Sequence, residues 1–171
     1  SLSSDTYTSS SSTSDSSGWS EGDEIVVVDS GTANDPTKKI KMPCEIGIAC
    51  SDESTALSTG DVASVLIPRA MTVTEVKASL TTEDSSDAVE VDFYYSSTTP
   101  GSSNGSAMLT YTYLNVSSGS YMQSETGIFD DGSGSATDTY SLAEDSFVTV
   151  KVESAGTEAR GLKVWLLGYW S

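Results

Sequence analysis

The segment from Cys44 to Thr82 predicts the architecture of this chain, and it reads CEIGIACSDESTALSTGDVASVLIPRAMTVTEVKASLTT. Apolar residues recur at every second position in two places, first at Ile46, Ile48 and Cys50 and then at Val76, Ala78 and Leu80. A polar turn and the apolar run 62–67 lie between them. A period of two is typical of strands with one face buried and the other in water. We therefore predict two or three half-buried strands at the start of an all-β domain.

The same alternation continues to the C-terminus. It recurs in residues 89–95, 108–113, 147–152 and 162–167, with shorter candidates at 127–129 and 139–142. Turn-forming loops separate these ranges, and Ser, Thr, Gly and β-branched residues leave no helix of useful length. About eight strands at this spacing predict an antiparallel, jelly-roll-like β-sandwich, with an immunoglobulin-like sandwich as the alternative.

The first twenty residues are of low complexity, since fourteen of them are Ser or Thr. Their only large apolar side chains are Leu2, Tyr7 and Trp19. Such a segment buries too little apolar surface to offset the entropy that it loses on ordering. Residues 1–23 are therefore either a disordered tail or, as we expect, an extended arm that orders on a partner through Leu2, Tyr7 and Trp19.

Residues 24–43 predict a β-hairpin connector. A short apolar strand with acidic ends, Glu24–Asp29, precedes a turn that contains Gly31 and Pro36, and residues 38–42 carry three lysines. Opposite charges on paired strands stabilise a hairpin. Because proline interrupts strand pairing, Pro43 is expected to end the hairpin, and the head domain is predicted to span residues 44–171.

The charge balance limits the partners. The chain has 25 acidic and 8 basic residues, which gives a formal net charge of −17. Phosphate groups would be repelled by such a surface, so neither nucleic acid nor an anionic membrane is an expected partner. No run approaches the roughly 18 apolar residues of a membrane-spanning helix.

Histidine is absent, and the two cysteines are Cys44 and Cys50. The missing histidine excludes a Ser-His-Asp triad and every zinc site that uses a histidine ligand, and two cysteines are too few for a cysteine-only zinc site. Both cysteines lie on one face of the predicted strand, roughly 20 Å apart, which is too far for a disulfide unless the strand breaks at Gly47. We expect both to be buried, and we predict no catalytic residues.

An acidic, glycine-rich loop spans residues 130–138. Its carboxylates, Asp130, Asp131 and Asp138, are hard oxygen ligands of the kind that calcium prefers. The loop lacks the spacing and the bidentate Glu of an EF-hand, so a solvated loop is the alternative. Calcium is the one possible cofactor that the sequence indicates, and paired carboxylates could also serve glycoside hydrolysis if their separation fits.

Tyrosines crowd the middle of the predicted head, and aromatic residues close the chain. Some must face the core, whereas exposed Tyr and Trp are typical of subunit interfaces and sugar-binding surfaces. The candidates for an oligomer or ligand surface are Tyr94, Tyr111, Tyr113, Tyr121, Trp165 and Trp170.

Three segments carry a resemblance: IACSDESTALSTG at 48–60, IPRAMTVTEVKASL at 67–80 and GLKVWLLGY at 161–169. They resemble a β-rich domain of structural, mostly fibre-like proteins of tailed bacteriophages, often phages of aquatic habitats. The resemblance covers roughly residues 38–170. The strand, turn and Lys-bearing strand of 24–42 are also similar to the connectors that precede phage fibre heads.

The resemblance implies a non-enzymatic virion protein on the surface of the phage particle. We expect a short fibre or a capsid decoration subunit, anchored by its arm to capsid, portal or tail proteins and assembled as a homotrimer. The alternative is a carbohydrate-binding, receptor-recognition tip that binds a host-surface glycan. A glycan depolymerase is a third possibility, which the missing histidine and the absence of a nucleophile motif disfavour.

Overall fold

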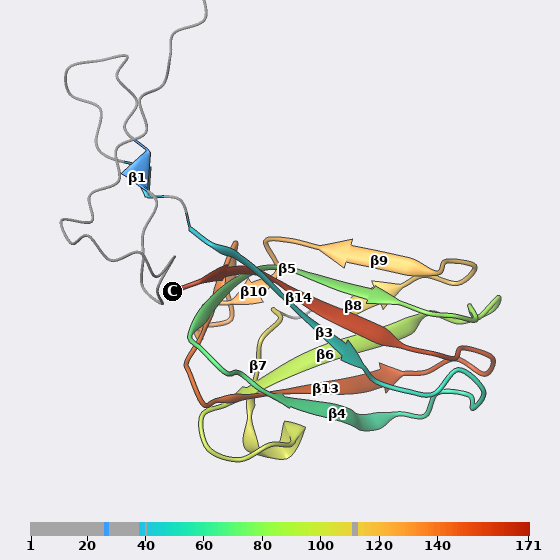
Figure 1. Ribbon diagram of the computed structural model, residues 1–171. Coiled ribbons are helices and arrows are strands. Elements are labelled where there is room, and N and C mark those ends of the chain that lie inside the picture. The colour runs from blue at the N-terminus through green and yellow to red at the C-terminus, as the bar shows by residue number, and fades with distance from the viewer. Residues whose placement is uncertain (1–25, 28–37, 40, 111–112) are drawn as a thin grey trace, which may run out of the picture. The chain divides into compact units, whose positions relative to one another are not determined.

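Two antiparallel sheets pack face to face in the part of the chain that begins at Pro43 (Figure 1). The computed structural model describes residues 26–27, 38–39, 41–110 and 113–171. The chain divides into two units, Ser1–Met42 and Pro43–Ser171. In the first unit, β1 (Val26–Val27) pairs antiparallel with β2 (Lys38–Lys39), within the predicted hairpin.

The first sheet of the second unit has the order β12-β5-β14-β3, and β9 also pairs with β5. Its strands are β3 (Pro43–Ala49), β5 (Met71–Ser79), β9 (Met122–Glu125), β12 (Tyr140–Leu142) and β14 (Lys163–Trp170). The second sheet has the order β4-β13-β6-β7, and β8 also pairs with β6. Its strands are β4 (Gly60–Leu66), β6 (Val89–Ser96), β7 (Ser106–Ala107), β8 (Leu114–Val116) and β13 (Phe147–Ser154).

The strand pairs are nested along the chain. The first long strand, β3, pairs with the last, β14, then β4 pairs with β13, β5 with β12, and β6 with β7 and β8. This is the connectivity of one long antiparallel hairpin rolled into two sheets, which is a jelly roll. The predicted all-β, jelly-roll-like sandwich is therefore confirmed, and the immunoglobulin-like alternative does not apply.

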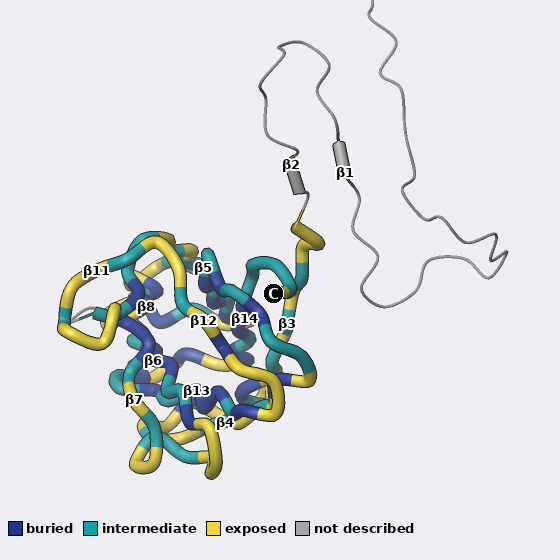
Figure 2. Tube along the Cα trace, turned by 90° about the vertical axis from the view of Figure 1, so that its left-hand side faces the viewer, coloured by how far each residue is buried: buried dark blue, intermediate teal, exposed yellow. Residues whose placement is uncertain are grey.

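The core lies between the sheets, where Figure 2 shows the buried residues in dark blue. Phe93 and Phe129 are its largest fully buried side chains, and Val, Leu, Ile and Met fill the rest. In β5 the inward-facing residues change parity from Val73 to Val76, because a bulge at Thr74 adds one residue opposite β14. The Thr74 hydroxyl donates to the carbonyl of Leu167 at 3.3 Å, so both groups are hydrogen-bonded at the bulge.

Two expectations from the sequence need correction. Pro43 does not end the hairpin but begins β3, which is possible because an edge strand tolerates proline at its first position. Residues 108–113 are not one strand: β7 ends at Ala107, and Met108 and Leu109 are both buried. Leu109 instead forms an isolated bridge with Phe129, next to the short pair of β10 (Phe129–Asp130) and β11 (Ala136–Thr137).

Both cysteines are free thiols, and their burial differs. Cys50 is buried as predicted, and burial raises its pKa to about 12. Cys44 is only half-buried, because the inner face of an edge strand is covered on one side alone.

Candidate functional surfaces

The predicted attachment residues Leu2, Tyr7 and Trp19 lie outside the described residues, as does Tyr111. Their roles stay predictions. The remaining candidates all belong to the sandwich or its loops.

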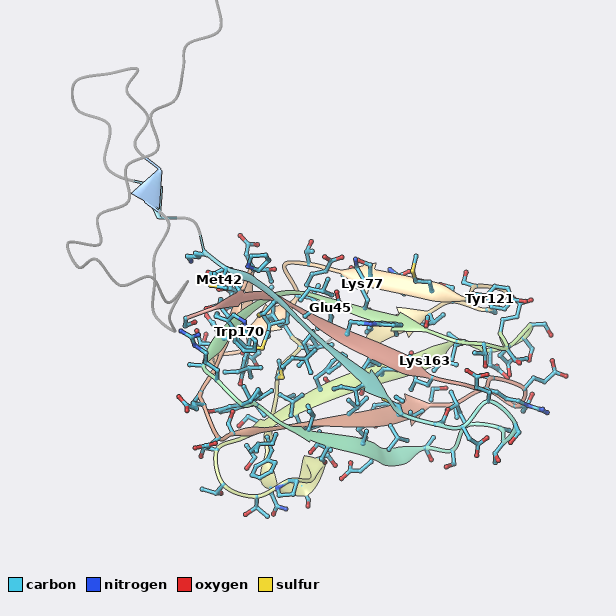
Figure 3. All side chains as sticks on the ribbon, viewed as in Figure 1. Met42, Glu45, Lys77, Tyr121, Lys163 and Trp170 are labelled. Carbon is cyan, nitrogen blue, oxygen red and sulfur yellow. The ribbon has the colours of Figure 1, made fainter. Side chains whose placement is uncertain are left out.

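The predicted aromatic residues do not gather on one surface. Tyr94 alternates with inward-facing residues of β6 and lies on the outer face of the second sheet, whereas Trp165 lies on the outer face of the first. Trp170 is half-buried against the core. Tyr113 and Tyr121 are the exposed ones, at 42% and 55%, and Figure 3 shows Tyr121 and Trp170 at opposite ends of the sandwich.

The outer face of the first sheet carries an aromatic and aliphatic row on its β14 strand: Trp165, Leu167 and Tyr169. Trp165 pairs with Gly47 on one side and Lys77 on the other, and a Cβ at Gly47 would lie 3.1 Å from the indole Nε1. Glycine at position 47 thus lets the indole lie close over β3. A sheet face of this kind offers a flat apolar platform to a ligand or a subunit.

Charged side chains border that row. Lys77 pairs with Glu75 at 3.3 Å, and Lys163 pairs with Glu53 at 2.7 Å. Figure 3 shows Glu45, Lys77 and Lys163 along the strands of this sheet. At the Pro43 end, an open hollow of about 420 Å³ adjoins the row, and its lining residues are Pro43, Cys44, Glu45, Thr74, Leu167 and Gly168.

The outer face of the second sheet is polar and partly covered by the loop 97–105. Gly101 N–H donates to the Thr149 hydroxyl at 2.9 Å, and Ser102 N–H donates to the Asp61 carboxylate at 3.0 Å. The loop contains the 3-10 helix η1 (Ser102–Asn104). Thr149, which points away from the core, is consequently only 1% exposed. Asp92 on the same face is 5% exposed, beside Lys151 of β13.

Asp92 is the most perturbed carboxyl of this face. Burial raises its pKa to about 6, and the nearby charge of Glu153 adds to the effect. The Tyr94 hydroxyl donates to Glu153 at 3.2 Å, and Lys151 pairs with the same carboxylate at 2.8 Å. Sequence reasoning missed this cluster, because Asp92 and Lys151 are neighbours only through strand pairing.

The predicted calcium loop is stabilised by its own hydrogen bonds. Asp130 accepts the N–H groups of Gly132 and Gly134 at 2.7 and 3.0 Å, and Asp131 accepts those of Ser133 and Ser135 at 2.8 and 3.1 Å. The Ser133 hydroxyl also donates to Asp131, and this bond, followed by the N–H groups of Ser133 and Ser135, lowers the pKa of Asp131. Within the described ranges no three acidic or cysteine side chains are placed to share a metal ion. Calcium binding by Asp130, Asp131 and Asp138 stays a prediction, and melting curves with millimolar calcium and with chelator test it.

Asp84, which the sequence placed in an acidic turn, has a structural role. Asp84 is 2% exposed, and its carboxylate accepts the N–H groups of Ser86, Asp87, Thr157 and Glu158. These bonds, the one from Glu158 first, lower the pKa of Asp84 far below the ordinary range. Asp84 therefore joins the 81–88 loop to the 155–161 loop.

Comparison with known proteins identifies no family. No family model matches the chain, and no curated protein is similar to it. One solved structure with some likeness is described as the structure of infectious bursal disease virus, Gx strain. The two chains are 9% identical with a TM-score of 0.26, over 86% of this chain and 42% of the viral one. This chain thus matches less than half of the viral chain's length. Across the described residues, no helix is long and apolar enough to cross a membrane.

Proposed function

We propose that this chain is a non-enzymatic structural protein of a bacteriophage virion, on the surface of the particle. One observation carries the proposal: a jelly-roll sandwich follows an N-terminal region of quite different, Ser/Thr-rich composition. Jelly rolls are used by viral capsid domains, and the resemblance of segments 48–60, 67–80 and 161–169 to phage structural proteins points the same way. The fold itself is compatible with many functions, so the composition of the N-terminal region is essential to the argument.

In this proposal the two units have separate tasks. Residues 1–23 lie extended on another virion protein of the capsid, portal or tail, with Leu2, Tyr7 and Trp19 in pockets. The acidic residues of this region favour a basic partner surface and an attachment that weakens with salt. The sandwich projects outward, as a short fibre or as a capsid decoration subunit.

Deletion of residues 1–20 tests the anchor. The sandwich begins at Pro43, so its melting temperature should not change, whereas incorporation into particles should be lost. A triple variant, Leu2→Ala with Tyr7→Ala and Trp19→Ala, should have the same effect, and Ser3→Ala with Ser9→Ala and Ser14→Ala is the matched control. If the truncated protein decorates particles at normal copy number, the arm is not the anchor.

Self-association belongs to the same proposal. A homotrimer is expected from the surplus of aromatic residues and from the resemblance, and the exposed Tyr113 and Tyr121 are available for contacts. Native mass measurement distinguishes a trimer from a dimer or a monomer.

A glycan-binding tip is the second candidate, and Trp165 is the observation that favours it. Its indole lies over Gly47 with polar side chains nearby, and sugars stack on such aromatic platforms. Titration with neutral oligosaccharides, followed by tryptophan fluorescence in the protein and in Trp165→Ala, tests this function.

A further inference from the structure

The open edge of β3 is unlike every other edge of the sandwich. In the described part of the second unit, β7, β8, β9 and β12 are edge segments of two to four residues. The edge strand β4 has seven residues, but its pairing with β13 is interrupted by a register shift. Short strands and bulges protect sheet edges from pairing with other chains. β3 also has seven residues, and its register with β14 is regular.

The backbone of β3 alternates between the sheet and the open edge. Cys50 N–H donates to the Leu162 carbonyl at 2.9 Å, so residues 44, 46, 48 and 50 direct their N–H and C=O groups toward β14. The groups of Glu45, Gly47 and Ala49 consequently point to the open edge, where no described strand pairs with them. Pro43 has no N–H, so the edge that can pair through donors and acceptors runs from Glu45 to Ala49.

The side chains of this edge suit another strand. Its inner residues Cys44, Ile46 and Ile48 pack against the core but stay half-exposed. Its outer residues Glu45, Gly47 and Ala49 are exposed, and Glu45 is the only charged residue of β3. Charged side chains normally prevent an exposed edge from pairing with another strand. The chain has a net charge of −17, yet this long edge has small outer residues and only one charge.

We propose that β3 pairs antiparallel with β3 of a second copy, about a two-fold axis at Gly47. The pairable edge is symmetric about this residue, so Gly47 faces Gly47 of the second copy and Glu45 faces Ala49 of the second copy. This register uses the outward-pointing N–H and C=O groups of Glu45, Gly47 and Ala49 in both strands, in three pairs that exchange about six backbone hydrogen bonds. It makes the two first sheets one continuous sheet.

The same register matches the side chains on both faces. On the inner face Ile46 lies opposite Ile48 of the second copy, so each covers the other's half-exposed surface. On the outer face the two Glu45 carboxylates lie opposite alanines and not opposite each other, which avoids a like-charge contact. An edge that is self-complementary in backbone, apolar residues and charge fits a two-fold contact with a second copy.

Charge variants of the full chain test both the contact and its register. Sedimentation velocity at 0.15 M salt and higher should show a dimer, because salt screens the repulsion between two acidic subunits. Ala49→Glu places one carboxylate opposite Glu45 in each of the two Glu45–Ala49 pairs and should weaken association at least tenfold, whereas Ala49→Lys should strengthen it. Glu45→Lys combined with Ala49→Glu should restore the dimer. Ala136→Glu, the same change at an exposed alanine of β11, is the matched control and should leave association unchanged.

A backbone variant tests the pairing independently of charge. Ala49→Pro removes an N–H that points to the open edge and none that pairs with β14, so the variant should be a monomer with a normal circular dichroism spectrum. Ala49→Ser keeps the N–H and should dimerise. A two-fold β3 pair joins two copies and cannot form a closed trimer, so this dimer is the alternative to the homotrimer proposed above. A wild-type protein that is a monomer or a trimer, or a double charge variant that fails to restore association, would overturn the proposal.

Discussion

Asp84 holds two loops together from a buried position, through hydrogen bonds from backbone N–H groups. Its carboxylate accepts hydrogen bonds from backbone N–H groups of its own loop, 81–88, and of the 155–161 loop. The bonds from Thr157 and Glu158 of the second loop measure 2.5 and 2.7 Å. Asp84→Ala would leave these N–H groups unpaired, so we expect the melting temperature to fall by roughly 5–10 °C. Asp87→Ala, at an exposed neighbour, is the control and should have little effect.

The depressed pKa of Asp84 gives this link a pH dependence. A carboxyl whose pKa is lowered on folding stabilises the folded state at pH values above the ordinary aspartate pKa, which is near 4. That contribution is lost as the pH falls from there toward the pKa of the folded state. The difference in melting temperature between wild type and Asp84→Ala should therefore shrink below pH 4. A difference that stays constant down to pH 2 would contradict this account.

Asp92 predicts the opposite trend. Its folded pKa of about 6 means that the folded state retains a proton that the unfolded chain releases near pH 4. Stability should fall as the pH rises through this window, by about 3 kcal/mol at neutral pH. Asp92→Asn stays uncharged and should be more stable than wild type at pH 7 and equal to it near pH 4. Urea denaturation at both pH values measures this, and equal stabilities at pH 7 would show that the charged carboxyl is not destabilising.

The roles of Asp84 and Asp92 could not be predicted from the sequence. Alternation predicts which face a residue takes, and it placed Val91 and Phe93 inside and Asp92 outside. It does not predict that Lys151 and Glu153 lie beside Asp92 or that residues 157 and 158 lie beside Asp84. Both contacts join residues that are distant in sequence.

At the scale of elements, the long strands were predictable, and so was the short strand β12, which was expected at 139–142. Most of the other short strands were not. β3, β6, β13 and β14 have regular alternation because each is covered on one face along most of its length, whereas a bulge interrupts the alternation of β4 and of β5. β8, β9 and β11 have two to four residues, too few for a period to be recognised. The alternation in 108–113 was misleading, since Met108 and Leu109 are both buried near Phe129, between β7 and β8 of the second sheet.

Gly168, near the end of β14, is required by the bulge opposite it. A Cβ at this position would collide with the carbonyl oxygen of Thr72, which is backbone and cannot move aside. We expect Gly168→Ala to destabilise the protein by roughly 3 kcal/mol or more, or to prevent folding. Gly132→Ala, at an open loop position with φ of 86°, should cost only about 1 kcal/mol and is the control. Chemical denaturation compares the two, and equal losses would contradict the packing argument.

The whole molecule combines a sandwich with a region of different chemistry in front of it. The change in composition indicated a separate N-terminal region, and the chain divides into two units at Met42–Pro43. The sequence could not predict the open β3 edge, because strand order depends on the pairing of β3 with β14, more than one hundred residues later.

The copy number of this protein in purified phage particles tests the central claim most directly. Quantitative mass spectrometry against the major capsid protein should find it in every particle preparation. Hundreds of copies per particle indicate a capsid decoration subunit, and a few copies per tail or vertex indicate a short fibre. Its absence from particles that are purified from cells expressing it would contradict the proposal that it is a virion structural protein.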